Sequence, residues 1–245
     1  MQSPQTHRRT PLKPLDNQTV VVIGGSSGIG AAVASNAAER GARVYSVGRR
    51  VETSETHDGV RHETADVTDD ASLRQLFERI GALDHLVITA GPSVSAKPLA
   101  DSDLLQAQQA FDVKFWGTLR AIQAALPYLS ERASITLTSG LLSRKFVAGQ
   151  FIKTTLNGAL EALAKQLAKE LAPRRVNVIS PGVTDTEAYA GMDEIQRTAM
   201  FARTSAALPV GRIGTPQDLA AAFMLVMENG FISGSIIDVD GGGLL

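Results

Sequence analysis

The sequence predicts one α/β domain, in which a doubly wound parallel sheet of seven strands carries helices on both faces. Short apolar runs rich in Val, Ile and Thr alternate with longer amphipathic runs, as in strands joined by crossover helices. The length of 245 residues suits one domain of this class. No internal repeat or low-complexity linker divides the chain, so we expect the domain to span residues 17–245 after a flexible arm, residues 1–16.

The elements are expected in an alternating order. The strands are predicted at residues 19–23, 43–47, 60–65, 85–89, 134–138, 175–179 and 236–239. The helices are predicted near residues 28–40, 71–80, 103–129, 150–171 and 216–228. Residues 192–208 contain no strand and interrupt the alternation, so we expect a helical flap over the site at about residues 187–210.

The composition excludes several functional classes. The 24 Lys and Arg residues balance 25 Asp and Glu residues without a basic block, so nucleic acid is not an expected partner. The absence of Cys excludes disulfides, thiolate catalysis and cysteine-bound zinc, and no other ligand spacing predicts a metal site. Residues 1–16 lack the apolar core of a signal peptide, and glycines break the uncharged run that follows. We therefore expect a cytoplasmic protein that binds neither a membrane nor a metal.

The first chemical signal is a glycine-rich turn between the first strand and the first helix. Glycine is needed where the chain turns sharply and where the backbone approaches a pyrophosphate. The helix N-terminus that follows offers free N–H groups to the anion. This context predicts a dinucleotide-binding turn, whose cofactor-binding residues are Gly24, Ser26, Ser27, Gly28, Ile29 and Gly30.

The end of the second strand indicates which dinucleotide is bound. An acidic residue there accepts hydrogen bonds from the ribose hydroxyls of NAD, whereas arginine pairs with the 2′-phosphate of NADP. Here the chain carries Arg49 and Arg50 and no carboxylate. The sequence therefore favours NADP(H) over NAD(H), although both arginines can also be read as solvated loop residues.

Further motifs, in the expected order, resemble those of the short-chain dehydrogenase/reductase family. Asp66-Val67 resembles the family's pair that contacts adenine. The segment after the fourth strand, which ends in Ala90-Gly91, resembles a second family motif. Residues 181–186 are similar to the family's loop beside nicotinamide. The resemblance covers residues 17–243. It implies a Rossmann fold, hydride transfer between nicotinamide and a small carbonyl or alcohol substrate, and a homotetramer or homodimer. The cofactor contacts that it adds are Asp66, Val67, Ala90, Gly91, Pro181, Gly182, Thr184 and Thr186.

The catalytic positions depart from this family. Its members carry a Ser after the fifth strand, a Tyr and a Lys one turn apart on the next helix, and an Asn on the preceding long helix. The Tyr transfers a proton, while the Lys binds the nicotinamide ribose and lowers the pKa of the Tyr. In this chain Ser139 matches the Ser, Lys153 stands at the Tyr position, Asn157 at the Lys position and Lys114 at the Asn position. The segment between Ser139 and the helix is slightly long for the family, so a one-residue shift there changes the comparison.

Three interpretations of these residues stay open. In the first, Lys114 and Asn157 exchange roles and Lys153 replaces Tyr as the proton donor, with a pKa lowered by burial and neighbouring positive charge. In the second, the protein is a redox-inert NADP(H)-binding sensor, scaffold or subunit of a hetero-oligomer. In the third, the lysines bind an anionic ligand, and water or the ribose transfers the proton. A decayed site usually fills with apolar residues, so the polar side chains favour some retained function. The enzyme is favoured because Ser139 and the loop beside nicotinamide match the family. Tyr189 is a reserve candidate for the missing hydroxyl.

Overall fold

The computed structural model describes residues 14–50 and 59–245, and it confirms the single α/β domain with a seven-stranded parallel sheet. The strand order is β3-β2-β1-β4-β5-β6-β7. The strands are β1 (Thr19–Ile23), β2 (Arg43–Gly48), β3 (Val60–Thr64), β4 (Leu83–Ile88), β5 (Leu129–Thr138), β6 (Arg175–Pro181) and β7 (Ile236–Val239).

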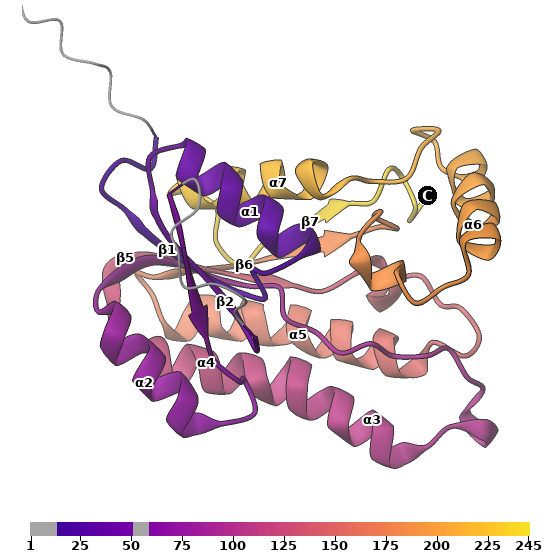
Figure 1. Cartoon of the computed structure of the whole chain (residues 1–245), viewed down its shortest axis with the longest axis horizontal. Coiled ribbons are helices and arrows are strands. Elements are labelled where there is room, and N and C mark those ends of the chain that lie inside the picture. Colours follow the sequence, from indigo (N-terminus) through magenta and orange to yellow (C-terminus); the bar gives the residue numbers. More distant parts are fainter. Residues whose placement is uncertain (1–13, 51–58) are drawn as a thin grey trace, which may run out of the picture.

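Helices cover both faces of this sheet, as Figure 1 shows. The α-helices are α1 (Gly28–Glu39), α2 (Asp70–Ile80), α3 (Leu104–Phe111), α4 (Gly117–Ala125), α5 (Phe151–Glu170), α6 (Glu194–Ala207) and α7 (Pro216–Glu228). The shorter turns are η1 (Leu99–Asp101), the π-helical turn η2 (Asp112–Trp116), η3 (Leu141–Ser143) and η4 (Glu187–Tyr189). No helix in the described part of the chain is long and apolar enough to span a bilayer.

The alternation of side chains along β1 explains the two layers. Val20 and Val22 pack with α1 and α7 in one core cluster, whereas Val21 and Ile23 pack with α2, α4 and α5 in the other. All four side chains are buried, as expected for a central strand of a parallel sheet. Figure 1 shows α1 and α7 on one face and α2, α4 and α5 on the opposite face.

Two predicted boundaries differ from the structure. The helix expected at residues 103–129 is three segments, α3, η2 and α4, and it ends at Ala125. β5 begins at Leu129, five residues before its predicted start, because Leu129 pairs with Leu83 of β4. Pairing with a distant strand is a tertiary contact that local propensity does not report.

The N-terminal boundary also lies earlier than expected. Leu15 is 1% exposed and donates its backbone N–H to the Arg40 carbonyl oxygen. It belongs to the α1–α7 core, so the packed domain includes residues that were assigned to the arm. Residues 1–13, which make up most of the predicted arm, lie outside the described residues.

The strand order places a ligand-binding crevice at one edge of the sheet. The chain passes from β1 to β2 and β3 on one side, and then returns to add β4 on the other side of β1. In open α/β sheets, ligands bind at the carboxyl ends of the strands where the order reverses. In Figure 1 this end of the sheet faces the side on which α6 stands apart from the two helical layers.

Candidate active site

The glycine turn is fixed between the carboxyl ends of β2 and β4. The backbone N–H groups of Gly24 and Gly25 both donate to the Val47 carbonyl oxygen, at 2.8 and 3.1 Å. Gly24 has a φ of +90°, and a Cβ there would lie 2.6 Å from the backbone nitrogen of Ala90. A Cβ on Gly30 would lie 2.1 Å from the Gly24 carbonyl oxygen. Only glycine fits both positions, so the turn presents bare backbone to the crevice.

The first turn of α1 is open to an anion. Ser27 is the residue before the helix and its side chain makes no capping hydrogen bond. Ser26 and Ser27 are both exposed, whereas Ile29 is partly buried against the α1–α7 core. The free N–H groups of this helix end and its positive dipole suit a phosphate.

The loop after β6 lies against the same helix end. A Cβ on Gly28, which has a φ of +52°, would lie 3.3 Å from the Thr186 Cβ and 3.3 Å from Glu187 Oε2. The Thr184 hydroxyl is buried and donates to a backbone carbonyl within the loop. The structure therefore brings the glycine turn together with Thr186 of this loop, whereas Pro181 ends β6, Gly182 lies against Asp240 and Thr184 pairs with Gly214.

The predicted adenosine-ribose contacts lie at the ends of β2 and β3. Arg49 and Arg50 are exposed, and Arg49 lies close enough to Asp66 to help lower the pKa of that carboxyl. The larger causes of the lowered Asp66 pKa are hydrogen bonds from the backbone N–H and the hydroxyl of Thr68, at 2.8 and 2.7 Å. Val67 is buried beside it. An exposed arginine therefore lies near the Asp66 carboxyl at this end of the sheet.

A partly buried lysine and a buried asparagine meet at the carboxyl end of β5. Lys114 lies in the π-helical turn η2, and its Nζ donates to Asn157 Oδ1 at 2.8 Å and to the Ser139 carbonyl oxygen at 3.4 Å. Asn157 Nδ2 donates to the Gly140 carbonyl oxygen at 3.3 Å. A Cβ on Gly91 would lie 3.8 Å from Lys114 Cδ, so the pair borders the segment after β4. π-turns within helices often mark functional sites because they redirect one side chain.

A second lysine adds its charge to this pair. Lys153 lies one turn before Asn157 on α5, and side chains at this spacing share a helix face. Burial, together with the smaller effect of the positive charge of Lys153, lowers the pKa of Lys114 to about 8. Burial also lowers the pKa of Lys153. The two ammonium groups therefore titrate closer to neutral pH than an ordinary lysine does.

The Ser139 side chain faces a different partner. Its hydroxyl donates to Glu161 Oε1 at 3.0 Å, and the residue is 6% exposed. A Cβ on Gly140 would instead lie 2.9 Å from Asn157 Nδ2. Position 140, not the Ser139 hydroxyl, therefore faces the Lys114–Asn157 pair. The comparison with the family assigns its Ser position to Ser139, whereas the residue that faces the pair is Gly140, one position later. The slightly long segment between Ser139 and α5 was the signal in the sequence for this shift.

A polar network beneath the site was not predicted. Glu161 is 7% exposed and accepts hydrogen bonds from Ser139, from Ser143 at 2.6 Å and from Arg144 at 3.4 Å. Arg144 also donates to both carboxylate oxygens of Asp238, at 2.6 and 2.5 Å. These contacts join α5, η3 and β7, and Arg144 and Asp238 stand 94 positions apart, so no local pattern reveals them.

The flap is helical, as predicted, and consists of η4 and α6. Tyr189 packs edge-on against Phe201, with ring centroids 5.3 Å apart, and burial raises its pKa. Arg197 of α6 forms an ion pair with Asp185. No residue of α6 is buried, so the flap is attached to the domain through few contacts.

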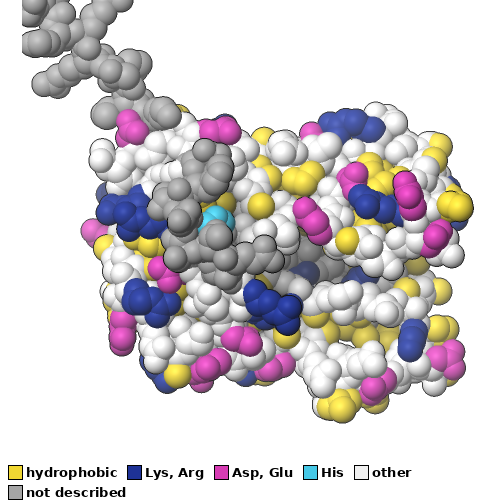
Figure 2. All heavy atoms as spheres, in the orientation of Figure 1, with side chains coloured by type: hydrophobic (Ala, Val, Ile, Leu, Met, Phe, Trp, Pro, Cys, Tyr) yellow, Lys and Arg dark blue, Asp and Glu magenta, His cyan; other side chains and the backbone are white. Residues whose placement is uncertain are grey.

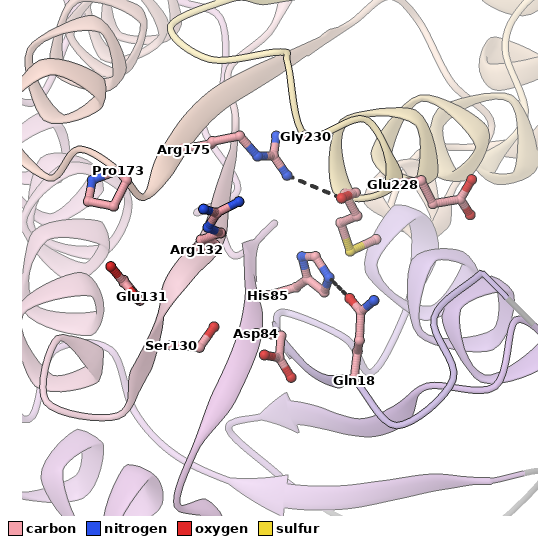
Figure 3. Close-up of a pocket in the computed structure, with 11 residues that line it drawn as sticks. Gln18, Asp84, His85, Ser130, Glu131, Arg132, Pro173, Arg175, Glu228 and Gly230 are labelled. Carbon is pink, nitrogen blue, oxygen red and sulfur yellow. Dashed lines mark hydrogen bonds between the residues drawn. The ribbon is translucent and has the colours of Figure 1, made fainter.

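A cavity of about 520 Å³ lies at the opposite edge of the sheet. Figure 3 shows its lining, which includes Gln18, His85 and Arg175 at the amino ends of the strands. The His85 ring bonds to Gln18 Oε1 at 2.5 Å and to the Ser134 hydroxyl at 2.7 Å. The length of the strands separates this cavity from the glycine turn, so it is not part of the candidate active site. Among the described residues no group of His, Asp or Glu could hold a metal ion.

Comparisons with known proteins agree with this geometry. The family model described as Enoyl-(Acyl carrier protein) reductase matches residues 23–243. A short-chain dehydrogenase/reductase of Stachybotrys chlorohalonatus is 32% identical over 93% of this chain and 97% of that protein. Carbonyl reductase family member 4 of Danio rerio is 32% identical over 92% of this chain and 98% of that protein. The crystal structure of a small-chain dehydrogenase in complex with NADPH is 45% identical, with a TM-score of 0.81 over 94% of this chain and 99% of that chain.

The fold and the glycine turn define the class of α/β nucleotide-binding oxidoreductases. Within that class, the chain belongs to the short-chain dehydrogenase/reductase family, as the family match over residues 23–243 shows.

Proposed function

We propose that this protein is an NADP(H)-dependent oxidoreductase that transfers a hydride between nicotinamide and a small carbonyl or alcohol substrate at a non-standard catalytic site. The Lys114–Asn157 hydrogen bond of 2.8 Å carries the proposal, because it keeps a cation and an amide where the family keeps Lys and Asn, with their helices exchanged. A site that had lost its chemistry would not be expected to retain a partly buried ammonium with two acceptors.

The residues present fit a dinucleotide. The glycine turn leaves no room for a Cβ at Gly24 or Gly30, and the first turn of α1 offers unpaired N–H groups to the pyrophosphate. Arg49, which is exposed after β2, would bind the 2′-phosphate of NADP. The loop containing Thr184 and Thr186 would border the nicotinamide. The bound cofactor supplies or accepts the hydride; the chain's own residues orient it and manage the proton.

Two lysines take separate roles in this proposal. Lys114, held by Asn157 and the Ser139 carbonyl oxygen, binds the nicotinamide ribose. Lys153 stands where the family carries its Tyr and donates a proton to the substrate oxygen during reduction. Partial burial lowers the pKa of the Lys153 ammonium toward the value that a general acid needs. Ser139 fixes the turn through Glu161 and does not contact the substrate.

Cofactor binding tests the first half of this function. Calorimetric titration should show that NADPH binds more tightly than NADH, and that Arg49→Ala weakens NADPH binding about tenfold while changing NADH binding little, because one charge-assisted phosphate contact is lost. Arg43→Ala is the matched control, since Arg43 is exposed at the start of the same strand, far from its carboxyl end. Equal loss of NADH affinity in Arg49→Ala would contradict the phosphate contact.

Turnover tests the second half. NADPH oxidation should be measured with a panel of carbonyl compounds in the wild type, Lys153→Met and Lys153→Ala. Loss of the general acid should lower the reduction rate by a factor of about 10² to 10⁴ while NADPH still binds. Unchanged turnover in both variants would remove Lys153 from the mechanism. Binding of NADPH without turnover of any compound would favour a redox-inert nucleotide-binding protein.

A further inference from the structure

We propose that the substrate of this site is an anionic carbonyl compound: one N–H of the Lys153 ammonium, beside Lys114, binds its carboxylate or phosphate group, and another N–H of the same ammonium faces the carbonyl oxygen that takes the proton. This inference rests on the proposed function and names its substrate class. It starts from the balance of charge in the site.

The two lysines lack an acidic partner within the described structure. Lys114 bonds only to uncharged acceptors, which are Asn157 Oδ1 and the Ser139 carbonyl oxygen. No hydrogen bond or ion pair joins Lys153 to any described residue. The acidic side chain that follows on α5, Glu161, is two turns further along and is bound by Ser139 and Arg144. The site therefore carries an excess of positive charge.

Other carboxylates at this edge of the sheet are engaged elsewhere. Asp185 forms an ion pair with Arg197 of the flap, and Asp238 binds Arg144. The Glu187 carboxylate lies beside Gly28 at the start of α1, which is the pyrophosphate end of the crevice. None of these three side chains neutralises Lys114 or Lys153.

The cofactor does not supply the missing negative charge. Its phosphates would bind at the first turn of α1 and beside Arg49, while its oxidised nicotinamide ring is positively charged. Desolvated ammonium groups without a counter-ion are costly, which agrees with the lowered pKa of both lysines. An anion on the substrate would offset this cost and gain a charge-assisted hydrogen bond.

The approach to the pair is also basic. The backbone N–H of Lys97 donates to the Gly149 carbonyl oxygen at 3.0 Å, which brings an exposed lysine to the start of α5. Lys145, after η3, is exposed and donates to the Gly243 carbonyl oxygen at 2.8 Å. Figure 2 shows this face of the molecule hollowed between the lobe that carries α6 and the layer of α3, with Lys and Arg atoms in the hollow. An anionic substrate would be attracted along this path.

Matched pairs of substrates test the proposal by turnover. Acetoacetate is compared with methyl acetoacetate, and dihydroxyacetone phosphate with dihydroxyacetone, at saturating NADPH. In the wild type, kcat/KM should favour the charged member of at least one pair about tenfold, as expected for one charged hydrogen bond. Lys153→Met should abolish this preference. Lys165→Met, which removes the same charge from an exposed position on α5, should retain it. A wild-type preference for the neutral members would overturn the proposal.

A binding measurement separates this proposal from the proposed function. Calorimetry measures the binding of oxamate and of inorganic phosphate to the NADP⁺ complex, with no turnover required. Either anion should bind the wild type and Lys165→Met, and at least about tenfold more weakly to Lys153→Met. Anion binding without turnover of any carbonyl compound would reject hydride transfer and keep the anion site. Absence of anion binding in the wild type would overturn the site even if neutral carbonyls were reduced.

Discussion

At the scale of single residues, the chemistry depends on the positive charges of Lys114 and Lys153 and on the amide of Asn157 that binds Lys114. Lys114 is fixed by the Asn157 amide, and Lys153, which has no hydrogen-bond or ion-pair partner among the described residues, adds its positive charge. In the family pattern a cation lowers the pKa of a phenol. Here burial lowers the pKa of both lysines, and the charge of Lys153 adds to the shift of Lys114.

This arrangement predicts opposite pH dependences for the two directions of the reaction. Reduction requires the protonated lysines, so its kcat/KM should fall as pH rises through about 8, where Lys114 loses its proton. Alcohol oxidation requires Lys153 as the free amine, so its rate should rise with pH until the charge on Lys114 is lost. Rates recorded from pH 6 to 10 in both directions check this. Parallel pH profiles in the two directions would show that no lysine transfers the proton.

At the scale of elements, the site depends on the turn that follows β5. The Ser139 carbonyl oxygen accepts a hydrogen bond from Lys114, and the Gly140 carbonyl oxygen accepts one from Asn157. Glu161 fixes the same turn by accepting a hydrogen bond from the Ser139 hydroxyl. Glu161 also accepts from Ser143 and Arg144, so its carboxylate links α5 to η3. Glu161 is therefore a positioning residue: it acts through the turn and does not contact the substrate.

Two substitutions of Glu161 separate its packing from its charge. Glu161→Leu leaves the Ser139 hydroxyl without an acceptor, while the Ser143 hydroxyl keeps the Gly140 carbonyl oxygen. It should therefore lower the free energy of unfolding by about 1–3 kcal/mol, more than Glu161→Gln does. Glu161→Gln keeps an acceptor and should lower kcat more than it changes NADPH affinity. Thermal unfolding, calorimetry and steady-state rates measure these effects, with Glu170→Gln on the exposed face of α5 as the control. An equal loss of unfolding free energy in Glu161→Leu and Glu161→Gln would show that Glu161 contributes only its negative charge.

The elements of the site differ in how far the sequence could predict them. The glycine turn is local, because Gly24, Gly28 and Gly30 mark positions where no Cβ fits, so its role could be expected from one segment. The seven strands could be expected from their apolar runs. The orientation of Ser139 could not, because it is decided by Glu161, 22 residues later on another element. The Arg144–Asp238 pair lies still further apart along the chain, so composition and spacing do not report it.

At the scale of the whole molecule, the two edges of the sheet have different functions. The carboxyl edge holds the candidate active site, whereas the amino edge holds His85, whose ring is 5% exposed and bonded at both nitrogens. Burial lowers the pKa of His85 to about 4, and the nearby charge of Asp84 only partly opposes this shift. Figure 3 shows His85 turned toward Gln18 at this edge. His85 therefore contributes to stability as the neutral form.

This predicts a loss of stability in mild acid. The His85 pKa is lower in the folded state than in the unfolded state, where it is near 6.5, so the unfolded chain binds more protons between these values. The contribution is present above pH 6.5 and is lost as pH falls toward 4, by about 2 kcal/mol between pH 7 and pH 5. The difference in melting temperature between pH 7 and pH 5 should be smaller in His85→Gln than in the wild type. His62→Gln, on β3, should leave that difference unchanged. If the melting temperature of His85→Gln fell between pH 7 and pH 5 as much as that of the wild type, the loss of stability would not be due to His85.

The transfer of hydrogen from the cofactor tests the central claim most directly. The protein is incubated with NADPH deuterated at the nicotinamide C4 and with the oxo acids and esters named above, and the products are analysed by mass spectrometry. Hydride transfer at this site predicts an alcohol that contains one deuterium in the wild type and about 10² to 10⁴ times less of it in Lys153→Met. Bound NADPH with no deuterated alcohol from any compound would contradict the assignment of this protein as a working oxidoreductase.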